Sequence, residues 1–172
     1  MTATRILLAP GASGNPAQLA PYRTRLAARG FDIETVALPK GKAERAMPVY
    51  AEALGGTAST TVIGGQSFGG RVASLIAPET RPAAVVCLSY PLHAPGRQPT
   101  WAERSAHWPE IACPVLLLSG ESDPFADIGL LRRAVEQLPH GVLVTYPGQG
   151  HSLSGVADAA VDAVVAFLEA NT

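Results

Sequence analysis

Apolar residues in this chain fall into short continuous runs, which alternate with longer segments where apolar residues recur every three or four positions. A run that is apolar throughout is typical of a parallel strand covered on both faces, and the longer segments are typical of amphipathic helices. The alternation predicts an α/β fold, in which helices cover both faces of a parallel sheet. The predicted strands are residues 5–9, 32–38, 60–64, 83–88, 115–119 and 142–146, and the predicted helices are residues 16–29, 43–54, 68–77, 128–138 and 156–170.

Residues 92–108 follow neither period and are rich in proline, histidine, tryptophan and charge, so we expect a surface excursion before the fifth strand. No internal repeat and no linker-like change of composition divides the chain. A length of 172 residues also suits one hydrophobic core. We therefore expect residues 1–172 to form a single domain.

Composition and charge narrow the classes of function. Hydrophobic residues make up 47% of the chain and charged residues 16%, which excludes a disordered protein. With 13 basic and 14 acidic side chains the net charge is -1, so neither nucleic acid nor a membrane surface is an expected partner. No apolar stretch approaches the roughly 20 residues that span a bilayer, and no signal-peptide pattern is present, so we expect a cytoplasmic protein. Cys87 and Cys113 lie in or beside apolar runs and are expected to be reduced thiols.

A candidate nucleophile follows the third predicted strand, at the end of the sheet where ligands of such folds bind. Gly65, Ser67 and Gly69 match the G-x-S-x-G pattern between a β-branched run and a helical segment. In a nucleophile elbow the serine occupies a strained strand-to-helix turn, and the flanking glycines avoid collisions with neighbouring backbone. The alternative is a phosphate-binding loop or a plain tight turn, although no G-K-[ST] follows and the glycine spacing is not that of a dinucleotide site.

A carboxylate and a base follow two later strands, in the chain order Ser, Asp, His. Asp123 stands in an Asp-Pro turn after the fifth strand, and His151 stands in a glycine-rich loop after the sixth. A serine hydroxyl needs a base to remove its proton and a third group to orient that base. We expect His151 to be the base and Asp123 the carboxylate, with Glu121 and Asp127 as local competitors. The alternatives are a turn-capping role for Asp123 and a surface position for His151.

Acyl transfer also needs N–H donors where oxyanion charge develops. The backbone N–H of Phe68, directly after the candidate nucleophile, is the first candidate, and that of Ala12, in the loop after the first strand, is the second. This glycine-rich loop precedes a helix, so a phosphate cradle is its alternative interpretation. Ser13, Gln66 and His93 lie beside these motifs and are the expected substrate contacts.

Together these motifs resemble the α/β-hydrolase superfamily, and most closely its short, nearly capless branch. That branch includes dienelactone-hydrolase-like proteins and relatives of a non-catalytic subunit of a histone acetyltransferase complex. The resemblance implies a minimal α/β-hydrolase fold of about six parallel strands in the order 2-1-3-4-5-6 with no lid domain, a catalytic triad of Ser67, Asp123 and His151, and oxyanion donors at Ala12 and Phe68. Serine at position 67 argues against the dienelactone hydrolases themselves, which use cysteine. The resemblance to the superfamily is carried by residues 7–12, 64–73, 89–96, 114–120 and 150–152.

The excursion also bears on the substrate. The segment 89–113 is too short for the helical lid that encloses long acyl chains in larger relatives, which predicts a shallow, open pocket. Four aromatic residues of the excursion could line the rim of that pocket: His93, Trp101, His107 and Trp108. The alternative for the two tryptophans is that they hold the excursion on the sheet. His93 and His107 have no carboxylate or cysteine at ligand spacing, so no metal is expected.

The sequence therefore predicts a cofactor-independent serine hydrolase, resembling a carboxylesterase, that cleaves small, short-acyl esters through an acyl-enzyme. Two alternatives stay open: a non-catalytic interaction module that keeps the elbow as scaffold, and a thioesterase or acyltransferase that uses the same residues. No oligomeric state is predicted.

Overall fold

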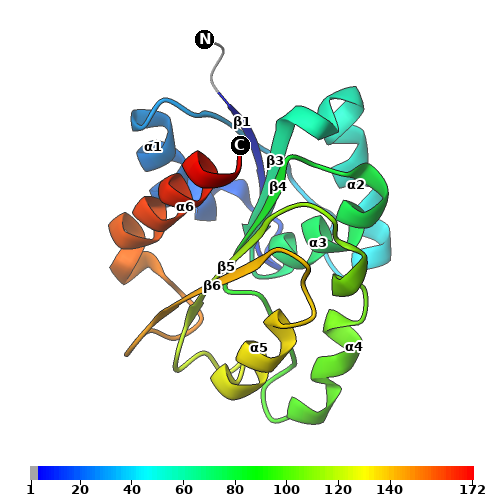
Figure 1. The fold of residues 1–172 in the computed structure, drawn as a ribbon, viewed down its shortest axis with the longest axis vertical. Coiled ribbons are helices and arrows are strands. Elements are labelled where there is room, and N and C mark those ends of the chain that lie inside the picture. Colours follow the sequence, from blue (N-terminus) through cyan, green and yellow to red (C-terminus); the bar gives the residue numbers. More distant parts are fainter. Residues whose placement is uncertain (1–3) are drawn as a thin grey trace.

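A parallel six-stranded sheet forms the centre of the computed structural model, which describes residues 4–172 (Figure 1). Its order, β2-β1-β3-β4-β5-β6, confirms the order implied by the family resemblance. All five neighbouring pairs are parallel, as crossover connections require. The strands are β1 (Arg5–Ala9), β2 (Asp32–Thr35), β3 (Thr61–Gln66), β4 (Ala84–Leu88), β5 (Val115–Gly120) and β6 (Gly141–Tyr146).

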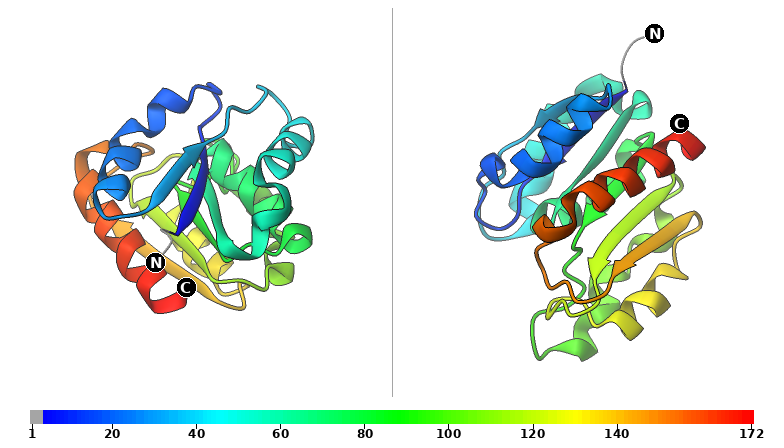
Figure 2. Two further views of the ribbon diagram at one scale, coloured as in Figure 1. Left: turned by 90° about the horizontal axis from the view of Figure 1, so that it is seen from above. Right: turned by 90° about the vertical axis from the view of Figure 1, so that its left-hand side faces the viewer.

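Helices cover both faces of this sheet (Figures 1 and 2). One hydrophobic cluster joins the sheet to α1 (Ala20–Ala28) and α6 (Ala157–Asn171), and a second cluster on the other face joins it to α2 (Ala43–Leu54), α3 (Phe68–Thr80) and α5 (Ile128–Val135). The remaining helical elements are short: α4 (Trp101–Ser105) and the 3-10 turns η1 (Pro16–Leu19), η2 (Gly55–Thr60), η3 (Gln98–Thr100), η4 (Trp108–Glu110) and η5 (Ser154–Val156).

Burial along the strands follows their place in the sheet. Every residue of β4 and β5 is buried, which explains why these runs are continuously apolar. The edge strands β2 and β6 are only partly buried. Strand β2 is shorter than the predicted 32–38, because the chain beyond Thr35 leaves the sheet edge after one more bond, from the Val36 N–H to the Leu8 carbonyl at 3.0 Å.

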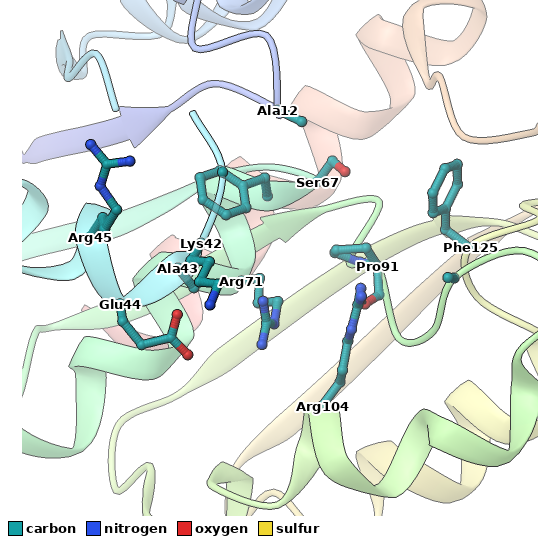
Figure 3. A pocket seen from close by; sticks show the side chains of 13 residues that line it. Ala12, Lys42, Ala43, Glu44, Arg45, Ser67, Arg71, Pro91, Arg104 and Phe125 are labelled. Carbon is teal, nitrogen blue, oxygen red and sulfur yellow. The ribbon is translucent and has the colours of Figure 1, made fainter. Parts of the chain in front are cut away.

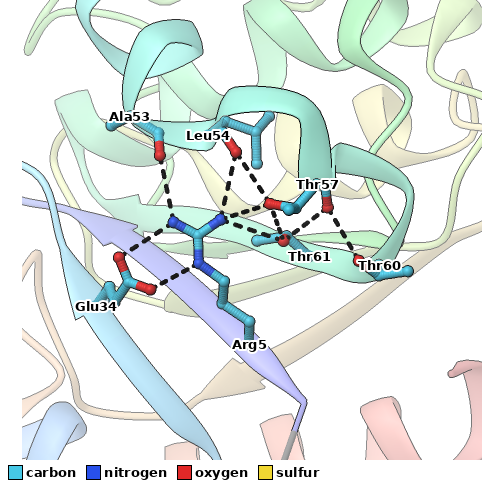
Figure 4. Close-up of polar contacts among 7 residues, drawn as sticks. All are labelled: Arg5, Glu34, Ala53, Leu54, Thr57, Thr60 and Thr61. Carbon is cyan, nitrogen blue, oxygen red and sulfur yellow. Dashed lines mark hydrogen bonds and ion pairs between the residues drawn. The ribbon is translucent and has the colours of Figure 1, made fainter.

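Arg5 ties together the end of the sheet that lies opposite the carboxyl ends of the strands (Figure 4). Its Nε and Nη2 donate to the two carboxylate oxygens of Glu34, at 2.7 and 3.1 Å. Its Nη groups also donate to the Ala53 carbonyl at 3.2 Å and to Thr57 Oγ1 at 2.7 Å. The hydrogen bond from Arg5 is the main cause of a lowered pKa of Glu34. One side chain thus connects β1, β2 and the end of α2.

The excursion after β4 carries only α4 and two 3-10 turns, so no cap domain is present in the described residues, as predicted. Trp108 is 1% exposed and packs edge-on against Tyr90, with ring centroids 5.0 Å apart. The Tyr90 hydroxyl donates to the Arg104 carbonyl at 2.6 Å. Trp108 therefore holds the excursion on the sheet, while Trp101 is partly buried beside Arg133. Within residues 4–172, no helix is long and apolar enough to cross a membrane.

Candidate active site

Ser67 stands at the turn between β3 and α3, in a backbone conformation that L-residues seldom adopt, with φ 49° and ψ -115°. The turn requires glycine on both sides. A Cβ added at Gly65 or Gly69 would lie 2.3 Å from the Ala9 carbonyl oxygen, closer than real contacts allow. The absence of side chains at these two positions lets β3 and α3 approach β1, and the sharp turn exposes the serine hydroxyl at the sheet edge.

The structure brings Ser67, His151 and Asp123 into one chain of hydrogen bonds. His151 Nε2 lies 2.8 Å from Ser67 Oγ, and His151 Nδ1 lies 2.8 and 3.0 Å from the two Asp123 carboxylate oxygens. The Asp123 side chain is fully buried, whereas the His151 side chain is 27% exposed. With its proton on Nδ1, the imidazole presents a free lone pair at Nε2 to the hydroxyl. This is the geometry in which a histidine can take a proton from a serine.

Two loops support this chain of contacts. Asp123 Oδ1 also accepts from the Phe125 N–H at 2.8 Å, and the Phe125 ring packs on the His151 ring with centroids 4.4 Å apart. The acid loop and the histidine loop meet at Gly120, where an added Cβ would lie 2.3 Å from the carbonyl oxygens of residues 149 and 150. Close backbone packing and one tilted aromatic contact therefore fix the carboxylate and the imidazole relative to each other.

The competing acids have other partners. Glu121 accepts from Thr145 Oγ1 at 2.8 Å and lies 3.6 Å from Arg132. Asp127 caps α5 by accepting from the Leu130 N–H at 2.9 Å. Neither carboxylate is hydrogen-bonded to His151, so Asp123 alone of the three candidates orients the imidazole.

The expected N–H donors both belong to residues that line the same cavity as Ser67. Phe68 begins α3, so its N–H has no partner within the helix and stands at the positive end of the helix dipole. Ala12 lies in the loop after β1, which passes close to the nucleophile: a Cβ added at Gly11 would be 3.8 Å from Ser67 Cβ. Ala12, Ser67 and Phe68 line one cavity of about 760 Å³, within the usual range for small-molecule sites.

The same cavity carries a concentration of positive charge that the sequence analysis missed (Figure 3). Four cationic side chains line it: Lys42, Arg45, Arg71 and Arg104. Glu44 is the one carboxylate among its lining residues, all of which belong to the described part of the chain. They come from the loop before α2, from α2, from α3 and from α4, so only the folded chain unites them. The single signal in the sequence is Arg71, one helical turn after Ser67.

The three expected substrate contacts do not line this cavity. Ser13 is exposed and accepts from the Asn15 N–H at 3.2 Å, and Gln66 ends β3 partly buried. His93 is 1% exposed, with Nδ1 2.9 Å from the Ala94 carbonyl and Nε2 accepting from the Asp127 N–H at 2.8 Å. Both ring nitrogens are therefore bound to backbone groups, and the structure places His93 in support of the acid loop and not in the cavity lining.

Comparisons with known proteins agree with this fold. Residues 39–162 match the family model of an alpha/beta hydrolase domain. The structure is similar to the monoacylglycerol lipase of Paleococcus ferrophilus, with TM-score 0.81, 16% identity and 96% of each chain covered. It is also similar to the enol-lactonase of Burkholderia xenovorans, with TM-score 0.80, 16% identity and 98% of this chain and 92% of that chain covered. For a thermophilic esterase of Thermogutta terrifontis the TM-score is 0.78, the identity 17% and the coverage 99% and 92%.

At such identities the structural likeness shows the fold alone, and none of the curated proteins searched matches the sequence significantly. The family model covers well over half of the chain. The chain therefore belongs to the α/β-hydrolase family.

Proposed function

We propose that this protein is a serine hydrolase that cleaves small carboxylic esters. The observation that carries the proposal is the hydrogen-bonded chain from Ser67 Oγ through His151 to the buried Asp123 carboxylate, at the mouth of a cavity large enough for a small molecule. Membership of a hydrolase family and likeness to a lipase, a lactonase and an esterase support it.

Acylation would begin when Ser67 Oγ attacks the ester carbonyl carbon and His151 Nε2 takes the hydroxyl proton. The negative charge that forms on the carbonyl oxygen is stabilised by the N–H groups of Phe68 and Ala12, and the imidazolium is stabilised by Asp123. The intermediate then collapses, the bond to the alcohol oxygen breaks, and His151 gives its proton to the departing alkoxide. The products are the free alcohol and an acyl group bound to Ser67.

Deacylation repeats these steps with water as the nucleophile. His151 takes a proton from the water, the water oxygen attacks the acyl carbon, and the same proton returns to Ser67 Oγ as the acid leaves. The absence of a cap over the described cavity favours small, water-soluble esters, because nothing encloses a long acyl chain.

Turnover of short p-nitrophenyl esters by wild type and by Ser67→Ala tests the proposal. We expect the variant to lose at least about 10⁴-fold in kcat, in line with the loss of a triad nucleophile in other hydrolases. Asp123→Asn should lose about 10⁴-fold with Ser67 still in place, because the imidazole would then hold the wrong tautomer. A fluorophosphonate should label wild type at Ser67.

Ser59→Ala is the matched control, since Ser59 is exposed, lies before β3 at the opposite end of that strand from Ser67, and is not among the residues that line the cavity. It should keep wild-type turnover and labelling. Equal turnover by Ser67→Ala and wild type would refute the proposal. Thioester substrates in the same assay test the related chemistry, because only the leaving group differs.

A further inference from the structure

Arg71 brings a partly buried positive charge to the cavity next to the candidate nucleophile. It lies one turn into α3, where its backbone N–H donates to the Ser67 carbonyl at 3.0 Å. Its Nε is buried and has no hydrogen-bond partner, the one side-chain atom of this kind found in residues 4–172. A buried donor without a partner destabilises a folded protein. The other N–H groups of the Arg71 guanidinium have no hydrogen-bond partner in residues 4–172 either, and because this side chain lines the cavity they are free to bind an acceptor that enters it.

Arg104 approaches the same space from α4 (Figure 3). One of its N–H groups is held by the Pro91 carbonyl at 2.9 Å, which fixes the guanidinium at the cavity wall. The pKa of Arg104 is lowered, mainly because the guanidinium is partly buried and secondly because of the positive charge of Arg71. The two arginines are therefore close enough to repel each other.

No carboxylate in residues 4–172 forms an ion pair with either arginine, and the charge of Glu103 is only the last of the causes that act on the pKa of Arg104. Within residues 4–172, neither guanidinium lies within 4.0 Å of a carboxylate oxygen, although Glu44 lines the same cavity. His107, which also lies beside Arg71, is kept neutral, because burial and the Arg71 charge lower its pKa to about 4. Its Nε2 lies 2.9 Å from Ser74 Oγ, which donates to the Arg71 carbonyl at 2.7 Å. The surroundings of Arg71 thus hold it in place without supplying an anion.

We propose that Arg71 and Arg104 bind a carboxylate of the substrate. The preferred substrate is then a monoester of a dicarboxylic acid, or another ester that carries a free carboxylate. This inference rests on the proposed function, because it assigns the part of the substrate that does not react. Guanidinium groups bind planar carboxylates through paired N–H donors, and a partly desolvated site strengthens such charge-assisted bonds. The further cations of the lining, Lys42 and Arg45, would attract the same substrates.

Paired substrates test the proposal. One series is the monomethyl esters of straight dicarboxylic acids from succinate to suberate, and the matched series ends in a neutral amide in place of the carboxylate. We expect kcat/KM to favour the carboxylate by about 10- to 100-fold at the best chain length, the range that charge-assisted hydrogen bonds supply. The difference should lie mainly in KM, since the bond is remote from the reacting carbonyl. An analogue that ends in a phosphonate distinguishes a carboxylate site from a phosphate site.

Variants assign the preference to residues. In Arg71→Met the ratio of kcat/KM for the two series should fall toward one, and Arg71→Lys, which keeps a point charge, should be intermediate. Arg97→Met is the matched control, because Arg97 belongs to the same excursion as Arg104 but is exposed and lies outside the cavity lining. Its ratio should equal that of wild type. A wild type without preference, a ratio that Arg71→Met leaves unchanged, or a stronger preference for the phosphonate would each overturn the proposal.

Binding separates this inference from the proposed function. Calorimetry with adipate on wild type, Ser67→Ala and Arg71→Met needs no turnover. If no ester is hydrolysed and no fluorophosphonate labels Ser67, the hydrolase proposal fails; adipate binding that Ser67→Ala keeps and Arg71→Met loses would still support the carboxylate site. Absence of adipate binding to wild type would refute the carboxylate site whatever the ester assays show.

Discussion

Replacing Gly69 by alanine places a methyl group where the fold has no room for one. Gly69 lies in the first turn of α3, and an added Cβ would stand 2.3 Å from the Ala9 carbonyl oxygen and 2.5 Å from the Pro10 carbonyl oxygen. These are backbone atoms, so no side chain can rotate away. They also lead directly into the loop that carries Ala12, the proposed second oxyanion donor.

The size of the effect follows from the overlap. Opening the closest contact to the 3.0 Å that real Cβ atoms respect requires the end of β1 to move by about 0.7 Å. Overpacking of this kind costs about 1–3 kcal/mol, while alanine gains about 1 kcal/mol over glycine as a helix former. We expect Gly69→Ala to lower the free energy of unfolding by up to about 2 kcal/mol. A donor displaced by nearly 1 Å should lower kcat by about 10- to 100-fold.

Two assays separate these effects. Thermal unfolding reports the stability, and a loss of up to about 2 kcal/mol corresponds to a fall in Tm of up to about 8 °C for a chain of this size. Ester turnover well below the Tm reports the displaced donor. Gly56→Ala is the control, because a Cβ there meets no atom within 4 Å, and it should match wild type in both assays. Wild-type Tm and wild-type turnover in Gly69→Ala would refute the reasoning.

Two further predictions concern stability. The ordinary pKa of a histidine is 6.5 and that of buried His107 is lowered to about 4, so between these values the unfolded chain binds a proton that the folded chain does not. The free energy of unfolding of wild type should therefore fall as the pH drops through this window. Urea unfolding of His107→Gln, whose amide can still donate to Ser74, should show a smaller fall. Parallel curves of stability against pH for variant and wild type would contradict the burial argument. The positive φ of Ser67 should make Ser67→Gly more stable than Ser67→Ala, since relief of about 1–3 kcal/mol of backbone strain exceeds the roughly 0.4–1 kcal/mol that glycine loses in the unfolded chain. Equal unfolding temperatures for these two variants would mean that the turn is unstrained.

The α/β class and the central strands could be predicted because burial determines which runs of the sequence are apolar, whereas the strand order was implied by the family resemblance. Strands β4 and β5 are buried on both faces and read as unbroken apolar runs. The glycines around Ser67 mark the elbow, because backbone approaches of 2.3 Å tolerate no side chain. Placement of the polar motifs after strands then sufficed to bring Asp123 and His151 to the same sheet edge as Ser67, since parallel strands share their carboxyl ends.

The end of β2 and the place of His93 differ from the predictions because tertiary contacts override local sequence pattern. The chain after Thr35 stays apolar because Val36 and Leu38 are buried, yet it leaves the sheet because an edge strand has a partner on one side only. His93 resembled a pocket residue because histidine is polar. The orientation of the His93 ring depends on hydrogen bonds to the backbone of Ala94 and Asp127, which bind both ring nitrogens. No sequence pattern specifies these contacts.

The cationic lining escaped prediction for a related reason. Arg71 and Arg104 are 33 positions apart in the chain, and the overall net charge of -1 gives no indication that they line the same cavity. Net charge describes the whole surface, whereas substrate recognition depends on the local charge of a cavity. A basic residue one turn after a candidate nucleophile is the pattern to examine, because the first turn of α3 faces the site.

The distribution of unfavourable features bears on the choice between an enzyme and a scaffold. The strained backbone of Ser67 and the buried, unpartnered Nε of Arg71 lie within one turn of α3, and both residues line the same cavity. Positive φ also occurs at Arg81, in the left-handed cap that ends α3, and at Ser89 after β4, but neither residue lines the cavity. Destabilising features that gather at one cavity are typical of a functional site. An interaction module that used this fold only as a support would need neither the exposed serine nor an uncompensated guanidinium beside it. Both are useful to a site that attacks an ester and holds its carboxylate.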